Sequence, residues 1–341
     1  MTYNILFRTS GGKSKGKELG FGHIYRTINL AKEFSKEKIF FLLEDFGGAK
    51  KIILENGYRN ITTVKKSYNL EQDYEKTIDF IKQNNIDLVI FDKYKIDKNY
   101  IKKFKQFVKT VVISDLSNIN YDSHLLVNGF IGFKNQLITK NSTTFLLGPK
   151  YQILDPKFKI MKAKNRSRKK FKKLLITVGG YDENNIIELF LKSISKNILF
   201  FDITLVLGPA TCLTKNLRLM KKNFSNNIKI ILSTNNMKKE ISNCDFGICS
   251  GGLTSYEFAT LGKPFALICQ SSHQILTARE WEHHKIAYNL GYPNNRIHSK
   301  IKILLENLLS NNINLRTKSV KFLDGKGSLR VSQKIYSLLK N

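Results

Sequence analysis

The sequence of 341 residues has few cysteines and no long apolar run. None of the four cysteines forms a CxxC pair, and each lies in or beside an apolar stretch, which predicts buried, reduced thiols: Cys212, Cys244, Cys249 and Cys269. No stretch approaches the ~18 uninterrupted apolar residues of a membrane-spanning helix, and the first residues show no secretory apolar region. We therefore predict a soluble, cytoplasmic protein.

Acidic residues are also scarce, with 27 Asp and Glu against 57 Lys and Arg, so the formal net charge is +30. Such an excess suggests nucleic acid, an anionic membrane or a polyanionic substrate as a partner. However, only 10 of the 57 cations are arginine, the residue that recognises guanine and phosphate with two hydrogen bonds. A lysine-led excess is typical of compositional drift. We predict no nucleic-acid partner, at most a weak peripheral membrane contact, and no obligate protein partner.

Predicted strands and helices alternate along the whole chain, a pattern typical of parallel sheets covered by helices on both faces. In the first half, the predicted strands are 3–8, 39–43, 60–64, 87–91 and 111–114, and the predicted helices are 24–34, 49–56, 70–84 and 99–107. In the second half, the predicted strands are 173–178, 203–207, 228–232, 246–249 and 264–268. The predicted helices there are 185–194, 214–223, 237–243, 255–261, 274–290 and 301–310, with a last one after Ser328.

The boundary between the two halves is marked by residues 157–173, which hold ten cations in seventeen residues. Such a block cannot pack into a core, so we predict a basic linker at 151–173. It separates an N-terminal Rossmann-like domain (1–150) from a C-terminal one (174–341). In doubly wound sheets, ligands bind at the carboxyl ends of the strands, so we expect a crevice between the domains to hold the ligand.

The first candidate site is the loop 9–22 between a strand and a helix, with five glycines: Gly11, Gly12, Gly16, Gly20 and Gly22. Glycines let the backbone approach an anion, and a helix start offers unpaired N–H groups. His23 follows at that helix start, where the positive partial charge is expected to keep the imidazole neutral and suited to act as a general base. Arg26, one turn later, is expected to steer phosphate or pair with a carboxylate. The alternative is a helix cap after a surface loop; the glycines do not form a GxGxxG fingerprint.

The second candidate site is the segment 249–257, where a strand is followed by Gly251-Gly252 and then by hydroxyl residues at a helix start. The N–H groups from Gly252 to Ser255 are expected to cradle a diphosphate, with the Thr254 and Ser255 hydroxyls as further donors. Glu257, placed in the first turn, is suited to accept from a ribose diol. The alternative is a capping box in which the acid only complements the helix dipole. A second glycine turn, Gly179-Gly180, also follows a strand, and the two together favour a nucleotide-diphosphate site.

Other polar residues end strands or share a helix. Asp92 and Asp115 each follow a predicted strand and are expected at the ligand edge of the sheet, unless they cap the next turn. His273, His283 and His284 lie on or near one helix, but HxxxH spacing is absent, and adjacent histidines are expected to point to different faces. We predict no metal site and no cofactor.

Several segments resemble the PseG/SpsG family, the nucleotide-sugar hydrolases of pseudaminic acid biosynthesis and the spore-coat polysaccharide proteins, which are relatives of the MurG glycosyltransferase. Residues 19–26 (LGFGHIYR) with Leu30-Ala31 are similar to the family's GxGHxxR…LA start, and residues 146–154 (LLGPKYQIL) to its interdomain segment. The C-terminal motifs follow in order: 178–182 (VGGYD), 207–209 (LGP), 236–237 (NM), 245–257 (with SGGLTSYE), 262–264 (GKP) and 324–327 (DGKG). The resemblance covers nearly the whole chain.

The resemblance implies a GT-B fold of two Rossmann-like domains, with UDP held mainly by the C-terminal one. By that match Glu257 binds the uridine ribose, and Gly180 and Gly251 to Ser255 bind the base and diphosphate. His23 would be the base that activates water for the hydrolysis of UDP-2,4-diacetamido-2,4,6-trideoxy-β-L-altrose. With His23 as the catalytic residue, the expected substrate-binding set is Gly20, Gly22, Arg26, Asp92, Gly179, Gly180, Gly251, Gly252, Thr254, Ser255, Glu257 and Gln274.

The sequence departs from the family pattern at residues expected near the sugar. The acid that usually follows the first arginine is absent after Arg8, Lys93 stands beside Asp92 where the hydrolase tends to show histidine, and His273 precedes Gln274 where asparagine is commoner. The match is therefore better for UDP than for the sugar. A MurG-like glycosyltransferase, with the lysine- and phenylalanine-rich helix 99–107 as a membrane-docking patch, and a non-catalytic nucleotide-sugar-binding protein are the alternatives.

Overall fold

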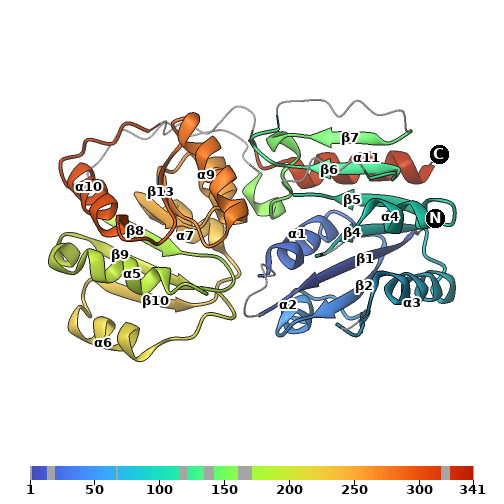
Figure 1. Cartoon of the computed structure of the whole chain (residues 1–341), viewed down its shortest axis with the longest axis horizontal. Coiled ribbons are helices and arrows are strands. Elements are labelled where there is room, and N and C mark those ends of the chain that lie inside the picture. The colour runs from blue at the N-terminus through green and yellow to red at the C-terminus, as the bar shows by residue number, and fades with distance from the viewer. Residues whose placement is uncertain are drawn as a thin grey trace. The chain divides into compact units, whose positions relative to one another are not determined.

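The computed structural model describes residues 2–13, 20–66, 68–94, 96–115, 121–133, 142–159, 171–315 and 323–340. The chain divides into two compact units (Figure 1). Unit 1 comprises Met1–Pro156 together with Gly325–Asn341, and unit 2 comprises Lys157–Asp324. Each unit is built on its own sheet, and the predicted crevice between them stays a prediction.

Unit 1 contains a sheet of seven parallel strands in the order β3-β2-β1-β4-β5-β6-β7. The strands are β1 (Asn4–Gly11), β2 (Lys38–Asp45), β3 (Ile61–Thr63), β4 (Leu88–Asp92), β5 (Lys109–Ile113), β6 (Leu125–Asn128) and β7 (Thr144–Leu147). β1 and β4 are neighbours although two strands and three helices separate them along the chain, and at this pair the strand order reverses. In parallel sheets this is where ligands bind, at the carboxyl ends.

Two pairs of helices cover the two faces of this sheet. α3 (Leu70–Gln83) and α4 (Lys98–Lys105) pack on one face, where their side chains form a common core with alternate residues of the strands such as Leu6 and Phe91. α1 (Gly22–Ala31) lies on β1 and contacts α11 (Gly327–Lys340), and Phe34 just after α1 packs edge-on against Tyr336 of α11. The short helix α2 (Ala49–Glu55) follows β2. This packing places the C-terminal helix in unit 1 and corrects the prediction that 174–341 forms one domain.

Unit 2 repeats the plan with six parallel strands in the order β10-β9-β8-β11-β12-β13. The strands are β8 (Lys173–Thr177), β9 (Asp202–Leu207), β10 (Ile228–Leu232), β11 (Phe246–Cys249), β12 (Phe265–Ile268) and β13 (Ala287–Gly291). The helices are α5 (Ile186–Ser193), α6 (Lys215–Asn223), α7 (Met237–Asn243), α8 (Leu253–Thr260), α9 (Ser272–His283) and α10 (Ile297–Leu309). Here the order reverses at β8 and β11.

The predicted α/β class and the alternation of strands and helices are confirmed, with two differences. The predicted helix 274–290 is wrong in its second half, because α9 ends at His283 and Ala287–Gly291 forms the edge strand β13. Strands β6 and β7 lie where no strand was predicted. Of the predicted linker 151–173, residues 160–170 lie outside the described residues, and the preceding Ile153, Leu154 and Phe158 are buried. Among the described residues, none of the helices has the length and apolar character that a membrane crossing requires.

Candidate functional site

The predicted site residues follow the two strand pairs at which the sheet orders reverse. In unit 1, the loop after β1 leads to His23 at the start of α1, and Asp92 is the last residue of β4. In unit 2, Gly179-Gly180 follows β8 and Gly251-Gly252 follows β11. Both sets therefore lie where doubly wound sheets bind ligands.

His23, Asp92 and Arg26 form a compact hydrogen-bonded group. The His23 Nδ1 atom lies 2.6 Å from Asp92 Oδ1. Arg26 donates two hydrogen bonds to the same carboxylate, from Nε to Oδ2 at 2.7 Å and from Nη2 to Oδ1 at 2.6 Å. Asp92 is fully buried, whereas the His23 side chain is 18% exposed. The exposed part of the imidazole can reach a ligand while its carboxylate partner is held inside the protein.

The contact with Asp92 defines the tautomer of His23. An ionised carboxylate only accepts hydrogen bonds, so the proton of the neutral imidazole lies on Nδ1, which faces Asp92 Oδ1. Nε2 then carries the lone pair and can take a proton. Asp92 thus has the role of a positioning residue, which fixes the ring orientation and stabilises the imidazolium once it forms.

The pKa of His23 does not follow the prediction from the sequence, in which the helix start keeps the imidazole neutral. Burial lowers this pKa, but the charge and hydrogen bond of Asp92, with a smaller contribution from Asp115, raise it by more. The net effect is a pKa above the ordinary value of histidine, because the contributions of Asp92 and Asp115 together outweigh those of burial and of the nearby Arg26 guanidinium. The base is therefore stronger than predicted and needs a higher pH to be free.

Arg26 is committed to carboxylates. Besides Asp92 it donates to both oxygens of Asp115, from Nη1 to Oδ1 and from Nη2 to Oδ2 at 3.2 Å. Of the two roles predicted for Arg26, the pairing with a carboxylate is confirmed. Because the donors of Arg26 are directed at two acids, its guanidinium has no free pair of N–H groups that could bind a phosphate with two hydrogen bonds. Steering of phosphate by Arg26 is therefore not supported.

The glycines before His23 allow close approaches of the backbone. A Cβ at Gly12, whose φ is +136°, would lie 2.7 Å from the Gly47 nitrogen, and one at Gly11 would lie 2.5 Å from Ile24 of α1. Gly12 N–H donates to the Gly20 carbonyl at 2.9 Å, which closes the base of the loop. In the part of the chain that the structure describes, no atom lies within 4 Å of the Cβ position at Gly20 or Gly22. Gly16 lies outside the described residues.

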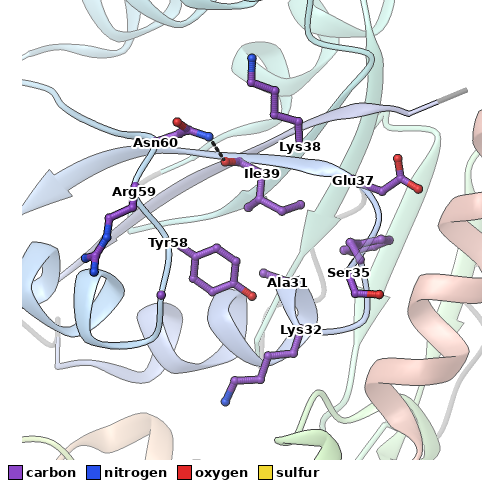
Figure 2. Close-up of a pocket in the computed structure, with 11 residues that line it drawn as sticks. Ala31, Lys32, Ser35, Glu37, Lys38, Ile39, Tyr58, Arg59 and Asn60 are labelled. Carbon is purple, nitrogen blue, oxygen red and sulfur yellow. Dashed lines mark hydrogen bonds between the residues drawn. The ribbon is translucent and has the colours of Figure 1, made fainter.

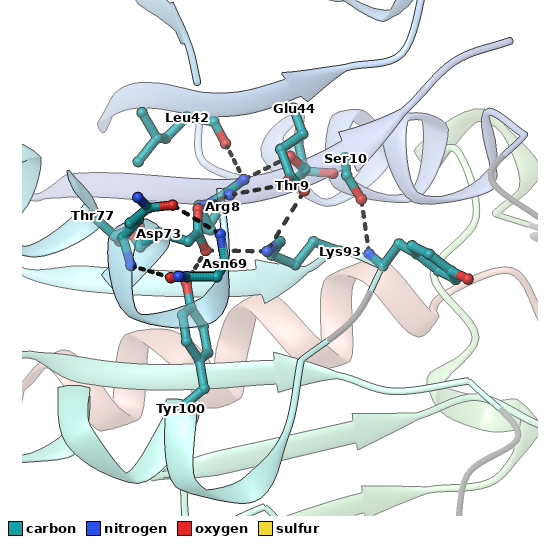
Figure 3. A network of polar contacts seen from close by, with 12 residues as sticks. Arg8, Thr9, Ser10, Leu42, Glu44, Asn69, Asp73, Thr77, Lys93 and Tyr100 are labelled. Atoms are coloured by element: carbon teal, nitrogen blue, oxygen red, sulfur yellow. Dashed lines mark hydrogen bonds and ion pairs between the residues drawn. The ribbon is translucent and has the colours of Figure 1, made fainter. Parts of the chain in front are cut away.

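On the opposite face of the sheet lies a buried network of charges that the sequence did not indicate (Figure 3). Arg8 is paired with Asp73 of α3, and the Lys93 ammonium lies 3.1 Å from Asp73 Oδ2 and 3.6 Å from Glu44 Oε2. The Tyr100 hydroxyl donates to Asp73 Oδ2 at 2.6 Å. Burial and the neighbouring Arg8 lower the pKa of Lys93, whereas Arg8 and Lys93 hold the pKa of Asp73 below its usual range despite burial.

This network accounts for Lys93, the departure from the family pattern beside Asp92. Successive residues of a strand point to opposite faces, so Asp92 faces α1 and the following residue, Lys93, turns toward α3. The Lys93 side chain is only 3% exposed, and its ammonium is paired with two acids. Lys93 is therefore part of the scaffold behind the His23 group, and the sequence separation of its partners explains why no local pattern revealed it.

In unit 2 the glycine turns are packed against each other and against the loop that follows β12. Gly179 has a φ of +85°, and a Cβ at Gly208 would lie 2.0 Å from the Gly179 carbonyl oxygen. Gln270 Nε2 donates to the carbonyls of Val178 at 2.7 Å and Tyr181 at 3.1 Å. Ser250 Oγ also donates to the Val178 carbonyl, at 3.2 Å. These bonds hold the Gly179-Gly180 turn beside the end of β11.

Two residues of the predicted substrate-binding set have internal hydrogen-bond partners instead. Gln274 Oε1 accepts from the backbone N–H of Gly251 at 3.1 Å and of Gln270 at 2.9 Å, so it ties α9 to the glycine turn. The fully buried Ser255 hydroxyl donates to the Gly252 carbonyl at 2.7 Å and accepts from Trp281 Nε1 at 3.0 Å. The structure thus corrects the prediction of the Ser255 hydroxyl as a phosphate donor, because its hydrogen atom is used inside the unit.

The start of α8 retains its anion-binding character. Gly252 is the N-cap and no side chain caps the helix, so the capping box considered as an alternative does not form. Thr254 and Glu257 are each 9% exposed. Because the helix begins at Leu253, Glu257 is its fifth residue and lies beyond the predicted first turn. The uncapped first turn can direct N–H groups at a diphosphate.

A hollow of about 480 Å³ lies elsewhere in unit 1, at the amino ends of β2 and β3 (Figure 2). Its walls come from the end of α1 and the segments around Lys38 and Tyr58, with Lys32 and Arg59 at the rim. Neither His23 nor Asp92 lines it. The position at the amino ends of the strands, away from the reversal of the strand order, separates this hollow from the candidate site.

Near the end of α9, three residues with metal-binding atoms come together. One ligand atom from each of Glu280, His283 and His284 lies within 4.8 Å of the others. This differs from the expectation that the adjacent histidines point apart and offer no metal site. The physical reason is that residues three and four positions along a helix both neighbour Glu280.

Comparison with known proteins shows which proteins the chain is similar to. Residues 173–332 match the glycosyltransferase family 28 C-terminal domain. The spore coat polysaccharide biosynthesis protein SpsG of Bacillus subtilis is 25% identical over 334 residues, which cover 93% of this chain and 94% of that protein. An uncharacterized protein of Methanocaldococcus jannaschii is 33% identical over 272 residues, 75% of this chain and 54% of its own length. The chain is thus similar to SpsG over nearly its whole length and to the family 28 glycosyltransferases in residues 173–332.

Solved structures show the fold class of the chain. MurG of Acinetobacter baumannii matches with a TM-score of 0.62 at 14% identity, covering 99% of both chains. The UDP-GlcNAc 2-epimerase of Neisseria meningitidis, solved with UDP-GlcNAc bound, matches with a TM-score of 0.58 at 13% identity over 99% of this chain and 100% of that one. The predicted GT-B-type α/β fold is thereby confirmed.

The resemblance to MurG does not extend to the predicted membrane-docking helix. In α4 the apolar residues Tyr100, Ile101 and Phe104 are buried in the core beneath α3 and α4. Only Phe107, after the helix, is exposed, at 55%. The lysines of this helix therefore cover a solvated face, and an apolar docking patch on α4 is not supported.

Proposed function

We propose that this protein is a nucleotide-sugar hydrolase that releases UDP and a free diacetamido-trideoxy hexose, in nonulosonic acid or surface polysaccharide biosynthesis. The observation that carries the proposal is the His23–Asp92 pair at an uncapped helix start, with Arg26 holding the carboxylate. Its arrangement suits the activation of a small nucleophile such as water.

The proposed reaction begins with removal of a proton from water by Nε2 of His23. The water oxygen forms a bond to the anomeric carbon while the bond from that carbon to the diphosphate oxygen breaks, and UDP leaves with the electron pair. The raised pKa of His23 favours holding the proton on the ring, and Asp92 stabilises the resulting imidazolium. Asp92 and Arg26 act through His23, so we assign them positioning roles.

We assign the leaving diphosphate to unit 2. Backbone N–H groups at the start of α8 and the Gly179-Gly180 turn are suited to stabilise its charge, and Glu257 is proposed to bind the ribose. Gln274 acts indirectly by fixing Gly251. Support for a uracil nucleotide comes from the structural neighbours, since one is described as bound to UDP-GlcNAc and another as a complex with UDP.

A glycosyltransferase with the same UDP-sugar donor is the second candidate. It is favoured by the match of residues 173–332 to a glycosyltransferase family 28 domain and by the MurG-like fold. In that case His23 would deprotonate a hydroxyl of an acceptor instead of water. The geometry of the His23–Asp92 pair serves both nucleophiles, so only turnover distinguishes them.

The decisive experiment is incubation of the purified protein with UDP-2,4-diacetamido-2,4,6-trideoxy-β-L-altrose and no acceptor. We expect stoichiometric release of UDP and of the reducing sugar, measured by chromatography of the nucleotide and NMR of the sugar. UDP-GlcNAc serves as the matched control donor. Turnover that requires an added glycan or lipid acceptor would rule out the hydrolase and favour the transferase.

A further inference from the structure

We propose that the end of α9 carries a zinc site formed by Glu280, His283 and His284, independent of the proposed hydrolase chemistry. One potential ligand atom of each residue lies within 4.8 Å of the other two. Two imidazole nitrogens and one carboxylate oxygen are a donor set that Zn²⁺ prefers in proteins. The fourth position of a tetrahedral ion would be taken by water.

The helix geometry explains why these three side chains converge. His283 and His284 lie three and four residues after Glu280, the two spacings that place side chains on neighbouring positions of a helix surface. α9 ends at His283 and its C-cap is His284, so both histidines project from the last turn. Their ring centroids are 5.3 Å apart, with the planes inclined by 78°. Small rotamer changes would bring the ligand atoms to the ~3.3–3.5 Å spacing of a tetrahedral zinc site.

Two further observations favour a cation at this place. The Glu280 Oε2 atom is buried and has no hydrogen-bond partner in the described part of the chain. A buried, unsatisfied carboxylate oxygen is unfavourable, and a metal ion would satisfy it. In addition, the C-terminal end of a helix carries a negative partial charge that stabilises a bound cation.

The ion would stabilise a helix that supports the glycine turn of unit 2. The first turn of α9 carries Gln274, whose oxygen accepts from Gly251 N–H, and its third turn carries Trp281, which donates to the Ser255 hydroxyl. Zinc at the last turn would hold α9 against fraying just before β13 begins at Ala287. The site is therefore proposed as structural, and bound zinc should raise the melting temperature.

The test is a zinc titration of the tag-free full chain in competition with a chromophoric chelator. We expect one Zn²⁺ per chain, and we expect Co²⁺ in its place to give the visible absorption of a tetrahedral site. Glu280→Gln, His283→Gln and His284→Gln should each weaken zinc binding by at least about tenfold. The matched control is His273→Gln, an exposed histidine of the same helix outside the cluster, which should bind zinc as the wild type does.

Two results would overturn the proposal. One is the absence of stoichiometric binding at zinc concentrations up to about 100 μM, well above the range of protein zinc sites. The other is zinc affinity that is unchanged in the double variant His283→Gln/His284→Gln, since the ion would then be bound elsewhere. Circular dichroism and the melting temperature of each variant without zinc show whether it is folded, and Glu280→Gln keeps the test decisive if a histidine variant does not fold.

Discussion

The two units have the same doubly wound topology, but their candidate sites consist of different chemical groups. In unit 1 the groups at the reversal of strand order are charged side chains, and Asp92 is hydrogen-bonded to His23 and Arg26. In unit 2 the corresponding positions are glycine turns and a helix start, whose polar groups belong to the backbone. Side chains with a perturbed pKa are suited to move protons, whereas backbone N–H groups bind an anion without titrating.

This difference also appears in what lies behind each site. Behind Asp92 is the buried network of Arg8, Asp73 and Lys93, in which removing one charge leaves others unpaired. Behind the turn at Gly251 are uncharged hydrogen bonds from Gln274 and Gln270 and close packing around Trp281. Substitutions in unit 1 should therefore affect turnover and charge balance, and those in unit 2 should affect binding of the nucleotide.

The largest effect on turnover is expected from His23→Ala. Removal of the proposed general base should lower kcat by roughly 10²–10⁴-fold. The dissociation constant of UDP, measured by calorimetry, should stay that of the wild type because unit 2 is untouched. Unchanged turnover would remove His23 from the reaction, and a parallel loss of UDP affinity would contradict the division of roles between the units.

Asp73→Asn should give the largest loss of stability. Asp73 is 1% exposed and balances both Arg8 and Lys93, so the variant leaves buried positive charge without its partner, a change that costs about 3–5 kcal/mol. The exposed Asp79 of the same helix gives the matched control Asp79→Asn, which should unfold as the wild type does. Denaturant unfolding of each variant measures the difference.

The pH dependence of that loss follows from the lowered pKa of Asp73. A carboxyl with a depressed pKa in the folded protein stabilises it above the ordinary pKa, and this contribution disappears as the pH falls through the folded value. The gap between the wild type and Asp73→Asn should therefore be full at neutral pH and shrink in acid. A gap that stays constant down to low pH would show that the charge of Asp73 is not the cause.

Asp92→Asn should change both the rate and the pH profile. Loss of the charged hydrogen bond to His23 removes about 1.5–3 kcal/mol, which corresponds to roughly 10–100-fold in kcat. Asp92 raises the pKa of His23, so the acidic limb of kcat against pH should move to lower pH in the variant. Asp115→Asn should move it in the same direction by less. A limb that does not move in Asp92→Asn would mean that a group other than His23 is the base.

The sequence allowed the two-sheet plan to be predicted because the buried strands are continuous aliphatic runs and the site loops are marked by glycine. His23 was identifiable from its place between a glycine loop and a helix, and Asp92 from its place at a strand end. The charge network was not, since Arg8 and Asp73 are 65 residues apart and meet only once α3 packs on the sheet. Likewise, the packing of Phe34 on Tyr336 that places α11 in unit 1 joins opposite ends of the chain.

Two local errors have local causes. The helical pattern of α9 continues in the sequence toward β13 because no glycine or proline separates them; Lys285, with a φ of +55°, makes the turn instead. A hydroxyl at a helix start suggests a bond to a ligand, which is why Ser255 was predicted as a phosphate donor. Its orientation is instead set by the Gly252 carbonyl, to which it donates, and by Trp281, from which it accepts. In both cases contacts beyond the local pattern override the propensity of the segment.

The smallest expected effect separates two adjacent glycines of unit 2. A Cβ at Gly251 would lie 2.8 Å from both the Cβ and the carbonyl oxygen of Gln274, whereas the nearest atom at Gly252 is 4.0 Å away. Gly251→Ala must therefore displace α9 or the turn, and we expect it to destabilise unit 2 by about 1–3 kcal/mol and to weaken UDP binding. Gly252→Ala replaces the N-cap glycine of α8 without a steric conflict and should lower the melting temperature by less than Gly251→Ala does. If the UDP affinity of Gly252→Ala nevertheless falls, the ligand approaches Gly252 itself, which would locate the diphosphate at the start of α8. Equal melting temperatures for the two variants would contradict the packing role of Gly251.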